Sequence, residues 1–216
     1  MPIIEKKYFY RSNLSWGLWH ITESLEELFE ALCPNEIDLS YLEKIGHEKK
    51  KKEFLASRLL LKQLLTYYEL EYKGVIKDDI LKPYLVGHKY HISISHSHDY
   101  ATAVIHPNFK TAIDIELISP KMLDIAPKFL NSEEAHYGLQ DARKATLLWC
   151  AKETLYKIYH GRGLIFKDNL FVRSFPSETD GFIETEICVG SLSWQYQMHY
   201  LERNGYGITF VEHSVI

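Results

Sequence analysis

The chain has 216 residues, of which 46% are hydrophobic and 25% are charged, as is ordinary for a globular protein with a packed core. A net charge of −4 argues against a nucleic-acid-binding protein that depends on bulk positive charge, and no apolar run is long enough to span a membrane. The N-terminal residues lack a signal-peptide core, and three scattered cysteines suit neither a disulfide framework nor a zinc site, so we expect a cytoplasmic protein.

In the first half of the chain, residue patterns predict strands at 14–21, 91–96 and 100–105. A short helix is expected at 25–32, and a longer one from residue 39 or 47 to residue 68. Because proline cannot donate to a sheet ladder, the segment 81–85 is expected to be a loop or an edge strand.

The second half predicts strands at 112–117, 169–174, 182–189, 193–200 and 207–212. A short helix is expected at 122–129. Asn131 or Ser132 caps a long helix that runs to Tyr159 and is broken near Gly138.

Both halves therefore follow the same order of strand, short helix, long helix, loop and antiparallel strands. This repeat predicts an α+β fold of two similar lobes, 1–106 and 107–216, each with a small antiparallel sheet and a long helix. The chain would be a pseudo-dimer with its active site at the interface of the lobes, where pockets commonly form.

The strand at 112–117 alternates apolar and acidic residues, so Asp114 and Glu116 point to one face. In the later helix, Trp149, Glu153 and Lys157 form one stripe at i, i+4 and i+8. If this stripe faces the strand, three carboxylates converge beside a lysine. Such an oxygen-only cluster suits Mg²⁺, which keeps several waters and binds substrate phosphates.

Each segment also has a purely structural interpretation. Glu153 and Lys157 have the spacing of an ordinary surface ion pair, and Asp114 and Glu116 could be the solvated face of an edge strand. Trp149 suits a core aromatic better than a substrate contact.

Four histidines lie close enough in sequence to suggest a zinc or nickel site, namely His88, His91, His96 and His98. No cysteine or second cluster accompanies them. We therefore favour a role for His96 in binding phosphate.

Taken together, Asp-x-Glu after a short strand and Trp-x-x-Lys-Glu-x-x-x-Lys on a helix resemble the signature of the surfactin-type 4′-phosphopantetheinyl transferases. Four further features occur where that family has them: Arg58, the pair 82–83 (Lys-Pro), the segment 92–97 (Ile-Ser-Ile-Ser-His-Ser) and the turn 161–164 (Gly-Arg-Gly-Leu). The sequence departs from the family at Leu81 and Ala112, where glycine is usual.

The resemblance implies an enzyme of the holo-[acyl-carrier-protein] synthase type. It would transfer the 4′-phosphopantetheine arm of coenzyme A to a serine of an apo acyl or peptidyl carrier protein, releasing adenosine 3′,5′-bisphosphate. Asp114, Glu116 and Glu153 would bind Mg²⁺, and Glu153 would also accept the serine proton, directly or through a water on the metal. Lys157 would contact the pyrophosphate and stabilise the leaving group.

The resemblance also assigns residues to coenzyme A itself. Arg58 would hold the 3′-phosphate, Lys82 would line the adenine side and His96 would bind a phosphate oxygen. Ser95, Lys152 and Lys157 complete the expected coenzyme A contacts.

The expected partner is a carrier from fatty-acid, polyketide or nonribosomal-peptide synthesis, docking near 49–52 or 121–129, with no nucleic acid and no membrane. We expect a monomer, since one chain supplies both lobes. Two alternatives stay open: a Mg²⁺-dependent nucleotide pyrophosphate hydrolase or transferase, and a non-catalytic coenzyme A-binding protein. No Walker loop supports the first, and the complete set of acids with Lys157 argues against the second.

Overall fold

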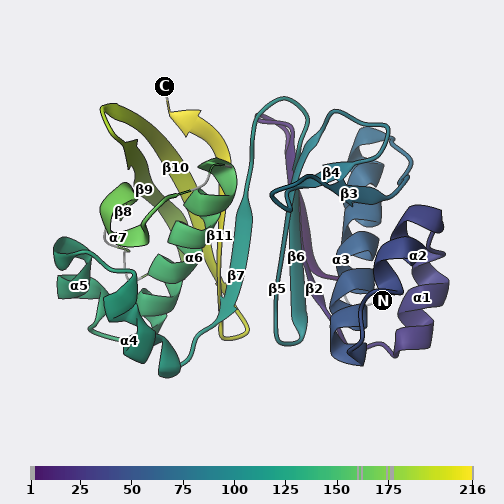
Figure 1. Ribbon diagram of the computed structural model, residues 1–216, viewed down its shortest axis with the longest axis horizontal. Coiled ribbons are helices and arrows are strands. Elements are labelled where there is room, and N and C mark those ends of the chain that lie inside the picture. The colour runs from purple at the N-terminus through teal and green to yellow at the C-terminus, as the bar shows by residue number, and fades with distance from the viewer. Residues whose placement is uncertain (1–2, 160, 162, 174, 176–177, 216) are drawn as a thin grey trace. The chain divides into compact units, whose positions relative to one another are not determined.

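The computed structural model describes residues 3–159, 161, 163–173, 175 and 178–215. The chain divides into two compact units, Met1–Thr111 and Ala112–Ile216, and each is α+β with one antiparallel sheet (Figure 1). Seven α-helices are found in the described residues, and none of them combines the length and the apolar character needed to cross a membrane.

The first unit contains a six-stranded sheet in the order β1-β2-β6-β5-β4-β3. Its strands are β1 (Ile3–Phe9), β2 (Leu14–His20), β3 (Val75–Lys77), β4 (Pro83–Leu85), β5 (His91–Ser97) and β6 (Tyr100–His106). The structure confirms β2, β5 and β6 as predicted. The expectation of a loop or an edge strand at 81–85 is wrong, because β4 in this segment pairs with both β5 and β3, and β3 is the strand at the edge. The sequence pattern does not reveal β1, whose charged residues interrupt the alternation, or β3, which is only three residues long.

The helices of the first unit are α1 (Leu25–Leu32), α2 (Glu36–Leu42) and α3 (Glu48–Leu65), followed by a 3₁₀ turn, η1 (Thr66–Tyr68). The predicted start at residue 39 is wrong, because α2 ends at Leu42 and α3 begins only after His47. Gly46 lies between α2 and α3, and glycine has a low helix propensity, which is consistent with a break at this point. The apolar side of α3 packs on the sheet through fully buried leucines such as Leu55 and Leu60.

The second unit contains a five-stranded sheet in the order β7-β11-β10-β9-β8. Its strands are β7 (Ile113–Leu117), β8 (Leu170–Val172), β9 (Asp180–Val189), β10 (Leu192–Arg203) and β11 (Tyr206–Val215). All five strand predictions are confirmed in position, although β8 is shorter than 169–174 and residue 174 lies outside the described residues. Asn204 and Gly205 form the two-residue turn between β10 and β11, with φ of 51° and 80°.

The helices of the second unit are α4 (Lys121–Ile125), α5 (Ser132–Gly138), α6 (Ala142–Tyr159) and α7 (Phe166–Asn169), with a 3₁₀ turn, η2 (Ala126–Lys128), after α4. The predicted break near Gly138 is confirmed. A Cβ at Gly138 would lie 2.5 Å from Leu148 Cδ1, so this close approach of α5 to α6 requires a glycine. Asn131 caps α5 in a capping box with Glu134.

The two sheets share one topology. Without β1, the first sheet has the order β2-β6-β5-β4-β3, which matches β7-β11-β10-β9-β8 strand for strand. In each unit the first of these strands leads into short helices and then a long helix, α3 or α6. The internal repeat predicted from the sequence is therefore present as a repeated topology.

Candidate functional site

Strand β7 places Asp114 and Glu116 toward the long helix α6. In the ladder with β11, Asp114 lies opposite Thr209 and Glu116 lies opposite Gly207. Two residues of α6 contact these β11 positions. The Thr154 hydroxyl lies 2.8 Å from the Thr209 hydroxyl, and the Cys150 thiol donates to the Gly207 carbonyl. Residues opposite each other in a ladder share a face, so both acids face α6.

Lys157 links α6 to the beginning of β7. Its ammonium group donates to Asp114 Oδ1 at 2.7 Å and to the Ile113 carbonyl at 2.9 Å. Asp114 is only 5% exposed, so this charge-assisted bond lies largely out of solvent. The predicted meeting of the lysine with the acidic strand is confirmed.

Glu153 lies in the same electrostatic environment. Burial, and then the neighbouring charges of Asp114 and Glu116, raise the pKa of Glu153 to about 7, while Lys157 acts in the opposite direction. Among the described residues, Glu153 therefore shares one electrostatic environment with two further carboxylates and Lys157.

The residues present fit a hard divalent cation by the chemistry of their donors. Carboxylate oxygens suit Mg²⁺, which needs few protein ligands because it retains waters. In the described part of the chain, no group of three or more His, Cys, Asp and Glu side chains forms a preassembled metal site. The three carboxylates thus influence one another electrostatically but are not already arranged as the ligands of a metal ion.

A cavity of about 600 Å³ lies beside Glu153. Its lining residues are Ile125, Lys128, Phe129, Trp149, Glu153, Tyr156, Leu164 and Phe166. The Trp149 ring packs against Phe129 and Phe166, at centroid distances of 4.9 Å and 5.6 Å. Trp149 is therefore a packed aromatic, as predicted, and also part of the cavity wall. The cavity offers a mostly apolar surface with one carboxyl group on it.

Lys152 requires a correction. Its side chain is fully buried, and its ammonium group pairs with Glu134 at 2.7 Å and donates to the carbonyls of Phe166 and Leu170 at 2.9 Å and 2.7 Å. Glu134 in turn accepts from the Val172 backbone N–H at 3.1 Å. The ammonium group of Lys152 therefore supplies hydrogen bonds to backbone carbonyls of α7 and β8. It has no exposed surface for a ligand, so its position does not support the predicted coenzyme A contact.

Arg58, on α3 of the first unit, is 6% exposed. Its guanidinium lies 3.7 Å from the centroid of the Phe54 ring and donates from Nη1 to Ser57 Oγ at 3.0 Å. Burial lowers the pKa of Arg58, and within the described residues Arg58 Nε has no hydrogen-bond partner.

His96 Nδ1 lies 3.4 Å from a carboxylate oxygen of Glu53, which Lys50 also contacts at 2.7 Å. Ser95 is half-buried on the next position of β5, whose side chains alternate between the faces of the sheet. This alternation places Ser95 and His96 on opposite faces of the sheet. The ring of His88 bonds to the Glu71 carbonyl at 2.8 Å, and the ring of His98 lies 3.2 Å from the Ser97 hydroxyl.

Lys82 lies in the loop before β4. Its ammonium group is 5.8 Å from the centroid of the Tyr84 ring, and burial and the charge of Lys110 lower its pKa. The loop is held by Asp78, which accepts from the Lys82 backbone N–H at 2.9 Å. Leu81 has φ of 65°, which explains why a glycine would be favoured there.

Residues 111–211 match the 4′-phosphopantetheinyl transferase superfamily. The matched segment is a little under half of the chain and contains β7 and α6. It therefore includes the acidic site, by which we mean Asp114, Glu116, Glu153 and Lys157. The superfamily transfers phosphopantetheine from coenzyme A to carrier proteins, so the match supports a transferase of this general kind. A comparison with curated proteins finds no match.

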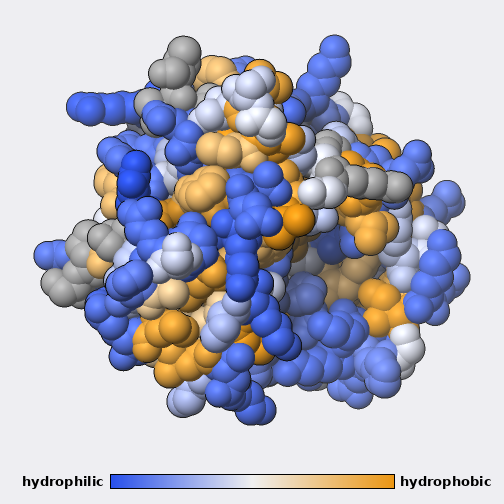
Figure 2. Space-filling view, turned by 60° about the vertical axis from the view of Figure 1, so that its left-hand side comes forward, coloured by the Kyte–Doolittle hydropathy of each residue, from blue (hydrophilic) through white to orange (hydrophobic). Residues whose placement is uncertain are grey.

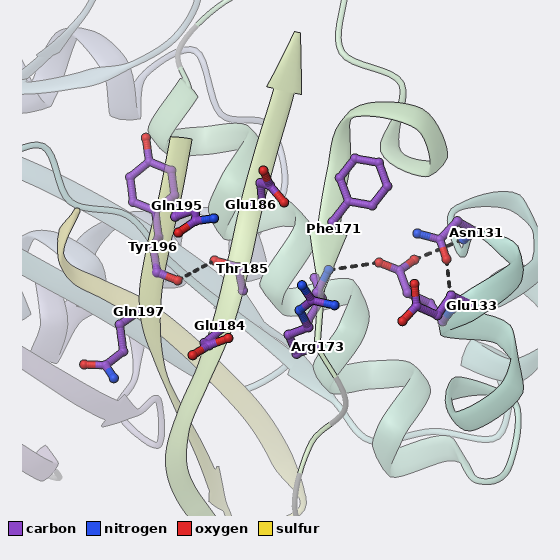
Figure 3. A pocket seen from close by; sticks show the side chains of 12 residues that line it. Asn131, Glu133, Phe171, Arg173, Glu184, Thr185, Glu186, Gln195, Tyr196 and Gln197 are labelled. Carbon is purple, nitrogen blue, oxygen red and sulfur yellow. Dashed lines mark hydrogen bonds between the residues drawn. The ribbon is translucent and has the colours of Figure 1, made fainter. Parts of the chain in front are cut away.

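A second cavity lies elsewhere on the sheet of the matched segment. Its volume is about 430 Å³, and side chains from β8, β9, β10 and the start of α5 line it (Figure 3). Glu133, Glu184 and Glu186 surround Arg173 there, and the four residues of the acidic site are not among its lining residues. Sequence reasoning did not identify this cavity, because its walls are ordinary alternating polar residues of surface strands. It is distinct from the site of β7 and α6.

Residue 162 of the predicted turn 161–164 lies outside the described residues. Near that turn and along the cavity beside Glu153, large apolar side chains reach the surface, including Ile125, Tyr156 and Ile165 with exposures of 37%, 39% and 58%. Figure 2 shows apolar patches of this kind scattered among hydrophilic side chains on one face of the molecule.

Proposed function

We propose that this protein is a surfactin-type 4′-phosphopantetheinyl transferase that acts with Mg²⁺ on the serine of an apo acyl or peptidyl carrier protein. The observation that carries the proposal is the joint environment of Asp114, Glu116 and Glu153 beside Lys157, inside the segment that matches the superfamily. An ordinary solvated strand face would not place three carboxylates in one desolvated region.

The metal would be held by Asp114, Glu116 and Glu153. When bound, Mg²⁺ would supply positive charge for the pyrophosphate of coenzyme A. Burial, and then the charges of Asp114 and Glu116, raise the pKa of Glu153, and a bound divalent cation would offset that negative charge, which supports this assignment.

Lys157 would stabilise the leaving group. In the proposed reaction the carrier serine oxygen forms a bond to the β-phosphorus, and the bond from that phosphorus to the bridging oxygen breaks. Negative charge then accumulates on the released adenosine 3′,5′-bisphosphate. Asp114 holds the ammonium of Lys157 in place beforehand, so little reorganisation is needed as this charge develops.

Glu153 would accept the proton of the attacking serine hydroxyl. Its place on the wall of the apolar cavity supports this role, since the cavity offers a surface for the methyl and methylene groups of the pantetheine arm. Packing of the arm against Trp149 and Phe166 would exclude water from the reacting phosphate, which limits hydrolysis of coenzyme A.

The first unit would supply the remaining contacts. As the resemblance implies, Arg58 would bind the 3′-phosphate, Lys82 would lie on the adenine side, and Ser95 and His96 would bind phosphate oxygens. The buried, incompletely bonded guanidinium of Arg58 supports its part of this assignment.

Intact-protein mass spectrometry tests the proposal. An apo carrier protein is incubated with the protein, coenzyme A and Mg²⁺, and the expected result is a mass gain of one phosphopantetheine arm that EDTA abolishes. Glu153→Gln should lower the rate by about 100-fold or more, whereas Glu133→Gln, an exposed glutamate of α5, should leave it unchanged.

Two outcomes would contradict the proposal. Cleavage of coenzyme A at the same rate without any carrier would indicate a pyrophosphate hydrolase. Coenzyme A binding with no transfer to acyl or peptidyl carriers would indicate a non-catalytic binding protein.

A further inference from the structure

Three polar side chains of α6 join this helix to the sheet beside the acidic site. Cys150, Thr154 and Lys157 follow one another at intervals of four and three residues, so they lie on one side of the helix. The Cys150 thiol donates to the Gly207 carbonyl of β11, and the Lys157 ammonium donates to the Asp114 carboxylate of β7. Thr154 lies between these two contacts and makes a contact of its own with the sheet.

This middle contact is a pair of hydroxyl groups. Thr154 Oγ1 lies 2.8 Å from Thr209 Oγ1, and it donates to the Thr209 carbonyl oxygen at 3.2 Å. A hydroxyl group has only one proton to donate, so Thr154 accepts the proton of the Thr209 hydroxyl in return. Both side chains are completely buried. The two hydrogen bonds therefore hold α6 at one defined position of β11.

That position lies beside two of the carboxylates. Asp114 is opposite Thr209 in the ladder of β7 and β11, and Glu153 is the residue before Thr154 in α6. A shift of the helix relative to β11 would therefore move Glu153 relative to Asp114. Mg²⁺ demands near-ideal geometry, with oxygen ligands at about 2.1 Å, so a site made from two elements depends on how those elements are held together.

The first unit shows that packing does not require hydroxyl groups at this position. Counted from the first residues of α3 and α6, Leu60 corresponds to Thr154. Counted from the tyrosines that begin β6 and β11, Ala103 corresponds to Thr209. Leu60 and Ala103 are completely buried, and a Cβ at Gly17, opposite Ala103, would lie 2.8 Å from Leu60 Cδ1. The fold thus accepts apolar packing here, which supports a functional reason for the two threonines.

We propose that Thr154 and Thr209 are positioning residues of the divalent-cation site, because their hydroxyl pair sets where Glu153 lies relative to β7. This inference rests on the proposed function, in which the cation is Mg²⁺ and binds together with coenzyme A. Thr154 occupies an unspecified position of the helix motif that carries the family resemblance, and Thr209 lies outside those motifs.

Isothermal titration calorimetry of coenzyme A binding to the full chain, in Mg²⁺ and in EDTA, tests the inference. The measured quantity is the gain in coenzyme A affinity that Mg²⁺ produces, which requires neither a carrier protein nor turnover. Thr154→Val should lower this gain by about tenfold, as expected when a group that orients a metal ligand is removed. The affinity in EDTA should not change, because no metal is bound there.

A double variant separates positioning from stability. Thr154→Val alone leaves the Thr209 hydroxyl buried without its acceptor, whereas Thr154→Val with Thr209→Val removes both hydroxyl groups. The urea midpoint of the double variant should therefore lie closer to that of the unmodified protein than the midpoint of the single variant does. Its Mg²⁺-dependent gain should stay low, because the contact that positions the helix is still absent.

Two single variants serve as controls. Thr154→Ser keeps the hydroxyl group and should keep the gain. Thr146 is also completely buried on α6, but its hydroxyl donates within the helix, to the Ala142 carbonyl at 2.7 Å. Thr146→Val should therefore leave the gain unchanged, although it removes a buried hydroxyl from the same helix.

The outcomes distinguish this inference from the proposed function. If the unmodified protein shows the gain and either Thr154→Val or the double variant retains it, the positioning role is wrong and the proposed function stands. The inference also fails if Thr146→Val lowers the gain as much as Thr154→Val. If the unmodified protein does not bind coenzyme A, or binds it no better in Mg²⁺, the proposed function fails and the inference fails with it.

Discussion

The two units use one topology for different purposes. In each, a two-residue turn is followed by a tyrosine that starts a strand, Tyr100 in β6 and Tyr206 in β11. Counting along the ladders from these tyrosines, Asp114 of β7 corresponds to Gly17 of β2. By the same count Glu116 corresponds to Trp19, which is completely buried in the first unit.

The long helices differ in the same way. Both α3 and α6 have 18 residues, and counting from their first residues pairs Glu153 with Leu59, which is 1% exposed. Lys157 is paired with Gln63. The fold thus accepts apolar or neutral side chains where the second unit has its acids and lysine. These charged groups are not a requirement of the topology, which supports a functional reason for them.

Arg58 and Lys152 sharpen the comparison, because they occupy the same position of the two helices. Lys152 is paired with Glu134, whereas Arg58 has no such ion pair within the described residues. Lys152→Met should therefore destabilise the protein by about 3–5 kcal/mol, since it leaves the Glu134 carboxylate buried without its counter-charge. Arg58→Met should be close to neutral, because it removes a charge whose burial is costly.

Urea unfolding monitored by circular dichroism measures both effects. A double variant, Lys152→Met with Glu134→Gln, should recover part of the stability lost in the single one, because no charge is then left unpaired. If Arg58→Met destabilises the protein as much as Lys152→Met, the two buried cations are equivalent and the anion-binding interpretation of Arg58 loses its support.

A smaller effect distinguishes two glycines that face the long helices. At Gly17 an added Cβ would lie 2.8 Å from Leu60 Cδ1 and 3.3 Å from the Glu5 carbonyl oxygen, which cannot move easily. Gly17→Ala should cost about 1–3 kcal/mol. Gly207→Ala should cost less than about 1 kcal/mol, because its nearest neighbour is the flexible end of Leu147, at 3.0 Å.

The first unit shows which side chain the position of Gly207 can accept. Ala101 occupies the ladder position that corresponds to Gly207, so the topology tolerates a methyl group there. Thermal unfolding of the two alanine variants gives the comparison directly. Equal losses of stability would show that the long helix approaches both strands equally closely.

Local patterns explain why part of the site could be predicted. Alternation along β7 and the four-residue spacing along α6 identify Asp114, Glu116, Glu153 and Lys157 without any knowledge of their partners. The sequence cannot reveal that Lys152 is buried. Its partner Glu134 lies on another helix, and its two carbonyl acceptors belong to the segment around β8.

The same limit applies to elements with weak patterns. Strand β3 has three residues and becomes recognisable only through its pairing with β4. The position of Lys77 depends on this strand and on a hydrogen bond to Tyr41, which is 36 residues away in sequence. A contact of this kind becomes visible only in the folded chain.

The smallest expected effect concerns how the two units build tight turns. In the turn between β10 and β11 of the second unit, the left-handed positions are occupied by Asn204 and Gly205, which tolerate positive φ. In the first unit Leu81 adopts φ of 65° although a leucine side chain strains this conformation. The side chain is 72% exposed, so little packing offsets the strain.

Leu81→Gly should therefore stabilise the protein by about 0.5–1 kcal/mol, the strain relieved less the extra entropy of glycine in the unfolded chain. The loop itself should persist, because Asp78 Oδ1 still accepts from the backbone N–H groups of Ile80 and Lys82. Gly205→Ala is the opposite change in the other unit and should destabilise by a similar amount. Urea midpoints measure both. If Leu81→Gly instead lowers stability, the exposed leucine makes a favourable contact that outweighs its strain, and the loop before β4 is held by more than Asp78.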